Sequence, residues 1–472
     1  MLASFLVFLD VTIVNVAFPS ISESFPEATL PLLSWVLNGY NVVFAALLVP
    51  AGRLADRLGR ERMFMAGVAL FTVASALCAA APSPGALIAA RALQAVGAAI
   101  VVPTAAALLL AEFPAERQMQ ALAAGSAAAG ASAALGPSLG GALIDTFGWR
   151  AVFVVNLPLG LMMLAWCARW MRRRAVAAGP LPDALGTILL AASVGLVALA
   201  LVQGNDWGWT SGAVIAAAAG VAVLGPAAVV RSLRHPSPAF DLSLLRLADF
   251  RAANTVTLLF GAGFYAKLLC DVLFLTIVWG YSVATAGLAL SPSPLMTVVT
   301  APFAQRLSDR FGTRAMIVAG TALYGLGSAW FALRLTADRS YVADFLPATV
   351  CTGAGAGLAL PAVTSAAVRS LRDVDLGTGA ATNAMARQIG GVLGIAALVA
   401  ILGTGPALDL DRFQGGWLFT TAACGAAAAV ALAIARGGIP QAGSPDHRLL
   451  GDPRCAGGGE RSTVVRRARS PR

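Results

Sequence analysis

Long apolar segments alternate with short polar loops along most of the chain. Each apolar segment runs to about 20 residues, the length at which a helix rising 1.5 Å per residue crosses about 30 Å of hydrocarbon. The pattern therefore predicts an all-α polytopic membrane protein with fourteen transmembrane helices. The predicted spans are 1–20, 33–52, 63–81, 86–111, 119–144, 151–169, 184–203, 211–230, 252–278, 286–304, 315–334, 341–367, 386–405 and 415–436.

Composition and charge agree with a membrane protein. With 58% apolar and 12% charged residues, the chain has too little polar surface for a soluble protein of 472 residues. The loops on the side of the two termini, with their helix borders, hold 19 arginines, and the opposite loops hold four: Arg150, Arg334, Arg339 and Arg412. Because positive loops stay on the cytoplasmic side, we expect a multi-pass protein of the plasma (inner) membrane with both termini in the cytoplasm.

The two ends of the chain carry their own signals. The first span begins at Met1 with no basic flank, so either the true start lies upstream or this helix is barely long enough. It is not expected to be a cleavable signal peptide, because it lacks a charged n-region and contains Asp10. Residues 437–472 are rich in Gly, Pro and Arg, and we expect a disordered cytoplasmic tail that is solvated or contacts anionic lipid headgroups.

An internal repeat divides the chain. The segment AGRLADRLGRERMFMAGVALF at 51–71 recurs without gaps as AQRLSDRFGTRAMIVAGTALY at 304–324. Both copies follow predicted spans on the cytoplasmic side, so the two halves form a parallel repeat, and spans 7 and 8 are extra. The predicted domains are an N-terminal six-helix bundle (1–170), a linker with two extra transmembrane helices (171–250), a C-terminal six-helix bundle (251–436) and the tail (437–472).

Five motifs in order resemble the major facilitator superfamily, specifically its fourteen-span drug:proton antiporter branch. They are LDVTIVNVAFP (9–19), GRLADRLGRER (52–62), RALQAVGAA (91–99), LGPSLGG (135–141) and WRAVFVVNLPLG (149–160). The resemblance implies the major facilitator fold, two six-helix bundles plus two inserted helices. It also implies a proton-coupled secondary antiporter that exports amphipathic drugs, antibiotics or related small molecules by alternating access.

The resemblance also sets the expected partners. These are a small-molecule substrate, protons and the lipid bilayer, with no nucleic acid and no cofactor, since the proton gradient supplies the energy. We expect a monomer that works alone or with a periplasmic adaptor. An alternative stays open, a proton-coupled exporter or symporter dedicated to one specific metabolite.

An ATP-driven pump or an enzyme is not expected. A P-loop needs a lysine after glycine, and the only lysine of the chain, Lys267, follows Ala266. The two histidines, His235 and His447, lie in polar segments, and the six cysteines have no metal-ligand or disulfide spacing. We therefore expect no metal site.

Asp10 and Arg91 are the expected proton-coupling residues. A carboxylate at bilayer centre costs about 2.5–3.5 kcal/mol on insertion scales, so Asp10 needs a reason to lie in an apolar span. The resemblance gives it the role of proton carrier and gives Arg91 that of the cation responding to its protonation, with Gln94 as a plausible companion. The alternatives are a carboxylate permanently paired to hold helices together and an Arg91 that snorkels to the interface.

The repeated loop is the expected gate. Gly52 and Gly59 would allow tight turns, and Asp56 would accept from helix N-terminal amides. The resemblance implies a latch between the halves, and the alternative is a loop that is merely positive. The second copy has Gln305 and Thr313 in place of Gly52 and Arg60, which predicts a weaker latch. The latch residues are Gly52, Asp56, Arg57, Gly59, Arg60, Asp309 and Arg310.

A motif rich in glycine follows in predicted span 5. Gly136, Pro137, Gly140 and Gly141 lack long side chains and remove one backbone hydrogen bond, which permits close helix packing and a bend, and the resemblance links this motif to antiport. Generic helix packing is the alternative.

Lys267 and Asp271 are spaced i, i+4 and so share a helix face, where they form either a substrate or second proton site or a structural ion pair. Arg387, at the start of predicted span 13, is expected to anchor that helix at the interface.

Overall fold

The computed structural model describes residues 2–112, 132, 135–170, 182–238, 241–369, 371, 376–403 and 409–435. The chain divides into a unit of residues 1–435 and a second unit from 436 onward. The predicted tail at 437–472, most of the loop 112–118 and the first part of predicted span 5 lie outside the described residues.

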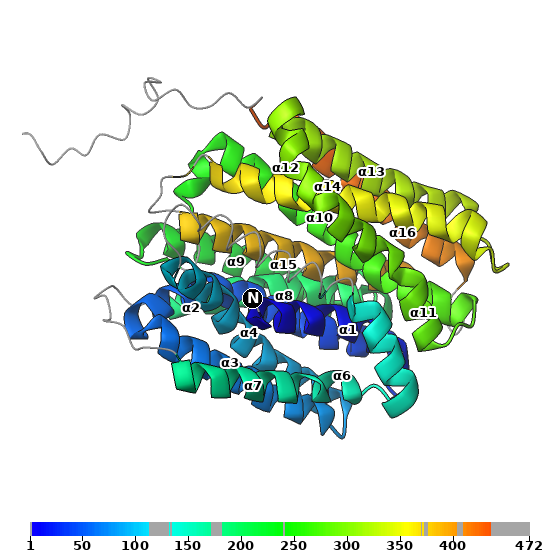
Figure 1. The fold of residues 1–472 in the computed structure, drawn as a ribbon, viewed down its shortest axis with the longest axis horizontal. Helices are drawn as coiled ribbons and strands as arrows, with labels where there is room; N and C mark the ends of the chain where they lie inside the picture. Colours follow the sequence, from blue (N-terminus) through cyan, green and yellow to red (C-terminus); the bar gives the residue numbers. More distant parts are fainter. Residues whose placement is uncertain are drawn as a thin grey trace, which may run out of the picture. The chain divides into compact units, whose positions relative to one another are not determined.

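Every element in the described part of the chain is helical (Figure 1). The elements are α1 (Leu2–Ser24), α2 (Leu30–Leu58), α3 (Arg60–Ala79), α4 (Pro84–Glu112), a helical segment at 135–147, α6 (Ala151–Val154), α7 (Asn156–Trp170), α8 (Ala184–Trp207), α9 (Gly212–Arg234), η1 (Leu244–Arg246), α10 (Ala248–Leu273), η2 (Phe274–Val278), α11 (Val283–Leu290), α12 (Pro292–Phe311), α13 (Thr313–Arg334), η3 (Tyr341–Phe345), α14 (Leu346–Arg369), α15 (Leu376–Leu402) and α16 (Leu410–Ala431).

The predicted fourteen-helix arrangement is confirmed. Twelve helices of the described residues are long and apolar enough to cross a membrane. The partly described span that includes 135–147 and the 22-residue α16 complete the fourteen. Several helices extend past the predicted spans, because a window of hydropathy records the lipid-facing length, whereas polar turns beyond it stay helical.

The repeat is visible in backbone geometry. Gly59 ends α2 and precedes α3 with φ of 99°, and Gly312 does the same between α12 and α13 with φ of 89°. Only glycine adopts this backbone readily, so the predicted turn at Gly59 is confirmed. The turn predicted at Gly52 is wrong, because α2 continues to Leu58 and Gly52 packs inside it against Pro103 of α4.

The two extra helices lie beside both halves of the repeat. Helix α8 packs against α2 and against α15, and α9 packs against α8. The Asn205 amide of α8 donates to the carbonyl of Ala400 at 2.6 Å. This placement makes α8 a support for two helices of different halves.

The end of this helix pair is fixed by a capping carboxylate. Asp183 accepts from the backbone N–H of Gly186 and pairs with Arg231 at 3.1 Å. Burial raises the pKa of this carboxyl, but the Gly186 N–H and the Arg231 guanidinium outweigh burial and hold the pKa below its ordinary value.

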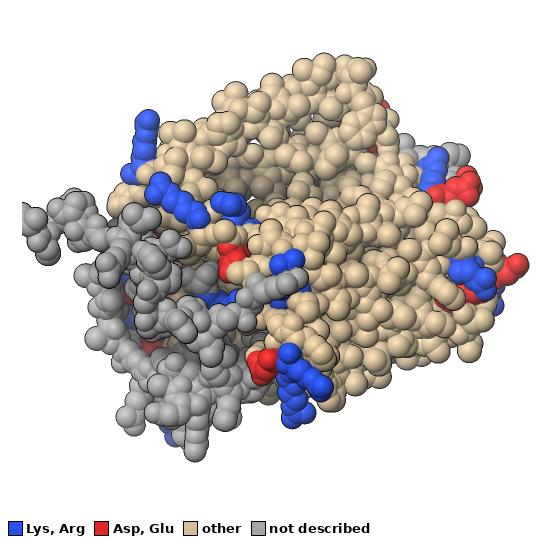
Figure 2. All heavy atoms as spheres, turned by 90° about the horizontal axis from the view of Figure 1, so that it is seen from above, with Lys and Arg blue, Asp and Glu red and all other residues tan. Residues whose placement is uncertain are grey.

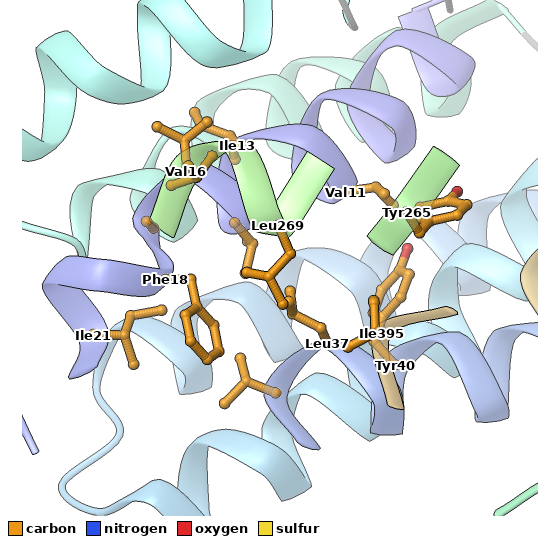
Figure 3. Packing of buried hydrophobic residues seen from close by; sticks show 14 of the residues in the cluster. Val11, Ile13, Val16, Phe18, Ile21, Leu37, Tyr40, Tyr265, Leu269 and Ile395 are labelled. Atoms are coloured by element: carbon orange, nitrogen blue, oxygen red, sulfur yellow. The ribbon is translucent and has the colours of Figure 1, made fainter. Parts of the chain in front are cut away.

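Helix α1 lies within a hydrophobic cluster shared by several helices. Val11, Ile13, Val16, Phe18 and Ile21 of α1 meet side chains of α2, α10 and α15 (Figure 3). The residues shown from those helices are Leu37, Tyr40, Tyr265, Leu269 and Ile395. Asp10 and Asn15 of α1 are buried in this surrounding, so they face protein rather than lipid.

Charged side chains are unevenly placed on the face shown in Figure 2. A wide area of uncharged residues separates Lys and Arg near one end of the helices from charged residues at the other end. This distribution fits helices whose middle lies in hydrocarbon and whose ends reach water.

Candidate functional site

Asp10 and Arg91 form a buried ion pair between α1 and α4. Arg91 Nη1 lies 2.6 Å from Asp10 Oδ2, and the two side chains are 1% and 0% exposed. The Arg91 guanidinium also lies over the Tyr40 ring, with Cζ 4.2 Å from the ring centroid, and its Nε donates to the carbonyl of Val36 at 3.3 Å. Arg91 therefore points into the bundle, and the snorkelling alternative does not describe it.

Amide side chains from α4 and from a third helix, α7, bind the second oxygen of Asp10. Gln94 Nε2 and Asn156 Nδ2 donate to Asp10 Oδ1 at 2.8 and 2.9 Å. Both amides also donate to Ser75 Oγ of α3, at 2.8 and 3.3 Å. The site thus joins α1, α3, α4 and α7. Arg91, Gln94 and Asn156 all donate hydrogen bonds to the Asp10 carboxyl oxygens, which suits an ionised carboxylate.

The site keeps one unused acceptor. Among the described residues, the Asn156 Oδ1 atom is buried and has no hydrogen-bond partner. Since rotation of an amide by 180° exchanges its oxygen and nitrogen, Asn156 can present either a donor or an acceptor to Asp10. The site can thereby satisfy both an ionised and a protonated carboxyl.

The sequence prediction found three of the five side chains of this network. Asp10, Arg91 and its companion Gln94 were expected, and the structure brings them together. Asn156 and Ser75 were not predicted as site residues. A lone amide inside the apolar run VVNLPLG was the available signal for Asn156, whereas a small hydroxyl residue such as Ser75 gives none.

The gate residues lie at helix ends, and their described contacts are local. Asp56 accepts from Arg60 Nε at 2.7 Å rather than from helix N-terminal amides, and both side chains are exposed. In the second copy, Gln305 Nε2 donates to Asp309 Oδ1 at 3.0 Å, and the exposed Arg310 lies over Phe311. Arg57 is half-buried. The latch between the halves stays a prediction.

Arg53, beside the gate, contacts the linker after α9. Its guanidinium donates to Ser237 Oγ at 3.3 Å and to the carbonyl of Pro238, and it lies 4.0 Å from Asp241. The first copy of the repeated motif is therefore tied to the two extra helices.

The glycine motif brings backbones together. A Cβ on Gly136 would overlap the Thr12 hydroxyl of α1, and one on Gly140 would lie 2.5 Å from Ile13 Cγ1. A Cβ on Gly141 would lie 2.7 Å from the Ala284 Cα of α11. The predicted close approach is present, and it joins the segment 135–147 to one helix of each half. The carbonyl of Pro137 contacts α11 at Gly287.

Lys267 and Asp271 form the predicted i, i+4 ion pair on α10. Both side chains are buried, and the Lys267 ammonium also lies 4.3 Å from the centroid of the Phe331 ring. The Trp417 indole donates to Asp271 Oδ1 at 2.8 Å. The rings of Phe331 and Trp417 thus contact the pair, and Phe274 and Phe413 pack against Trp417.

Arg387 is not an interface anchor. Helix α15 begins at Leu376, so Arg387 is 11 residues into it and its backbone carbonyl packs on Gly261 of α10. The hydropathy window missed this first part because it contains Thr378, Thr382 and Asn383. Thr382 and Asn383 are buried polar residues that face protein. Moving Arg387 out of the loop count leaves the arginine bias in place.

Comparisons with known proteins identify the family. The family model described as Major Facilitator Superfamily matches residues 1–266 and 255–454. A methylenomycin A resistance protein of Streptomyces coelicolor is 33% identical over 395 residues, which cover 84% of this chain and 82% of that protein.

Two other relatives have similar coverage. The multidrug resistance protein Stp of Mycobacterium tuberculosis is 34% identical over 85% of this chain and 74% of its own length. The cephamycin export protein CmcT of Amycolatopsis lactamdurans is 34% identical over 85% of this chain and 84% of its own length.

Solved structures share the fold. A structure from a study of substrate recognition in proton-dependent oligopeptide transporters superposes with a TM-score of 0.64 at 16% identity, covering 92% of this chain and 97% of that one. The nucleoside transporter NupG superposes with a TM-score of 0.61 at 12% identity, covering 92% and 98%. The family model and the relatives, which include export proteins, point to a transporter. The chain is a multi-span membrane protein and belongs to the major facilitator superfamily.

Proposed function

We propose that the chain is a proton-coupled antiporter that exports amphipathic drugs, antibiotics or related small molecules by alternating access, with both termini in the cytoplasm. The observation that carries the proposal is the buried Asp10–Arg91 pair, whose members belong to different helices and share one amide network. Export is supported by the printed functions of relatives, which include multidrug resistance and cephamycin export.

The geometry supports a proton cycle at Asp10. In its ionised form the carboxylate binds Arg91, Gln94 and Asn156. When a proton binds Asp10 Oδ1, rotation of the Asn156 amide can bring its own unpartnered Oδ1 to accept a hydrogen bond from that proton. Arg91 then loses its counter-charge, so the attraction between α1 and α4 falls. Protonation would thus change the helix packing that alternating access requires.

A change in helix packing would alter the contacts between the two halves. The segment 135–147 packs tightly on α11 through Gly141 and Pro137. The Gln388 amide of α15 donates to Asn41 Oδ1 of α2 at 3.3 Å and accepts from the Tyr265 hydroxyl at 2.9 Å. Two six-helix halves rocking around a midplane cavity would break and remake contacts of this kind.

We assign Lys267 and Asp271 a structural role rather than a second proton site. The two charges lie on one helix, so movement of that helix leaves their separation unchanged. The second oxygen of Asp271 binds an indole N–H, which can only donate, and aromatic rings enclose the pair. Both described partners of the carboxylate, Lys267 and Trp417, can only donate hydrogen bonds to it.

Transport in everted membrane vesicles tests the proposed function. With an imposed pH gradient, wild-type vesicles should accumulate at least one member of a panel of ethidium, Hoechst 33342 and dansyl amino acids. Asp10→Asn should abolish the gradient-driven part. The matched control is Asp338→Asn, which neutralises an exposed carboxylate outside the helices and should transport like wild type.

The outcomes separate cleanly. Gradient-driven transport that survives Asp10→Asn removes Asp10 from the mechanism. Absence of gradient-driven transport of every panel member in wild-type vesicles, with the protein present and folded, contradicts the proposed function.

A further inference from the structure

Three basic side chains lie well inside the described helices, and one of them lacks a carboxylate. Arg91 pairs with Asp10, and Lys267 pairs with Asp271. Among the described residues, the Arg387 guanidinium makes no ion pair and no hydrogen bond, and its neighbours include the Phe8 ring and the Tyr265 hydroxyl. A charge inside a membrane helix is costly unless it is paired or wet, so a half-buried arginine without an ion-pair partner among these residues is a candidate site for the anionic group of a ligand.

Arg387 lies near the middle of the helix bundle. It is 11 residues from the start of α15 and 15 from its end, about 17 and 22 Å at 1.5 Å per residue. Its guanidinium Cζ is 6.0 Å from the ring centroid of Phe8, which belongs to α1 in the other half. The cation therefore faces the contact between the halves, two residues along α1 from Asp10.

The surroundings of Arg387 combine polar and apolar side chains. A small pocket beside it is lined by the polar side chains of Thr257, Thr364 and Asn383. Its other lining residues are Phe260, Leu360 and Val363, which are apolar. The lining has the composition of a small-molecule site, but the pocket of about 10 Å³ holds only about one water, so a larger ligand would enter only when the helices move apart.

We propose that Arg387 binds the carboxylate of the exported molecule, so that the substrate class is apolar organic acids. The planar guanidinium fork matches the two oxygens of a carboxylate, and in a low-dielectric cavity it discriminates strongly against an uncharged isostere. This inference rests on the proposed export function, because it names the class of cargo for the same transporter.

Equilibrium binding to purified full-length protein in nanodiscs tests the assignment without a proton gradient. The probes are dansyl-phenylalanine and dansyl-tryptophan, each compared with its primary amide, and the dansyl emission reports binding. Wild type should bind each acid about tenfold or more tightly than its amide, the expected worth of a charge-assisted hydrogen bond. Arg387→Gln should reduce this preference to about twofold or less, with amide binding unchanged.

Two further variants make the result specific. Arg387→Lys keeps the charge but loses the fork, so it should retain part of the acid preference. Arg369→Gln removes one positive charge from the exposed end of α14 and should keep the full preference. Melting temperature and gel filtration establish that each variant is folded before binding is compared.

The inference is overturned if wild type binds the acids no better than the amides, or if the preference survives Arg387→Gln. Either result leaves vesicle transport untouched as evidence for export. Conversely, loss of gradient-driven transport with an intact acid preference would contradict the proposed function and leave the carboxylate site standing.

Discussion

The two ion pairs that are buried among the described residues are built differently. Asp10 and Arg91 lie on separate helices, α1 and α4, within a network of amide and hydroxyl groups. Lys267 and Asp271 lie one turn apart on α10, among aromatic rings. A pair that spans two helices weakens when either helix moves or when its acid is protonated, whereas a pair within one helix moves as a unit. An ion pair of an acid and a base can therefore respond to protonation in one half, as proposed for Asp10–Arg91, and only stabilise packing in the other, as proposed for Lys267–Asp271.

Removing both charges of each pair gives the largest expected contrast. Asp10→Leu with Arg91→Met should abolish gradient-driven dye accumulation in vesicles, because no proton carrier remains. Lys267→Met with Asp271→Leu should keep most of the transport per folded molecule, since apolar replacement of a buried pair is often neutral or stabilising. Loss of transport in both double variants would erase the distinction.

Removing one charge of the Lys267–Asp271 pair should chiefly lower the stability of the fold. Lys267→Met leaves the Asp271 carboxylate buried without its cation and is expected to destabilise the protein by about 3–5 kcal/mol. The second substitution, Asp271→Leu, should restore most of that loss. Unfolding in SDS, followed by circular dichroism, measures both. A single variant as stable as wild type would show that the pair contributes nothing to packing.

Changing the hydrogen-bonding partner of each carboxylate sharpens the contrast at a smaller scale. Trp417→Phe removes the indole donor to Asp271 and should lower stability by about 1.5–3 kcal/mol with transport kept. Asn156→Leu removes a donor and the unused acceptor beside Asp10, and should slow gradient-driven transport even where the melting temperature is maintained. If Trp417→Phe instead slowed transport more than Asn156→Leu, the two assignments would have to be exchanged.

An exposed pair provides the smallest expected effect. Asp56 and Arg60 also form an i, i+4 ion pair, but both side chains are exposed. Arg60→Ala should therefore change the free energy of unfolding by about 0.5 kcal/mol or less. A clear loss of transport by Arg60→Ala with unchanged stability would support the predicted gating role of this loop.

The fold could be predicted because the lipid imposes it. Helix number and the repeat follow from hydropathy and from the matched segments at 51–71 and 304–324. Helix ends were predicted less well, since α2 continues through Gly52 and α15 begins ten residues before the predicted span 13. Hydropathy does not distinguish a polar residue in water from one facing protein, and this failure also misplaced Arg387.

The site could be predicted in part. Asp10 and Arg91 stood out because charges in apolar runs are rare, and the resemblance paired their roles. The amide of Asn156 and the hydroxyl of Ser75 became site residues only through the packing of α3 and α7 on α1 and α4. Which helices meet is not written in any local pattern, so these partners required the structure.

Proton release on substrate binding tests the central claim most directly. Purified protein in a weakly buffered solution with a pH indicator receives a dye that the vesicle assay identifies as transported. Wild type should release protons as the dye binds, and Asp10→Asn should bind the dye without releasing them. Equal proton release by both proteins would contradict the account, because the exchanged proton would then belong to another group.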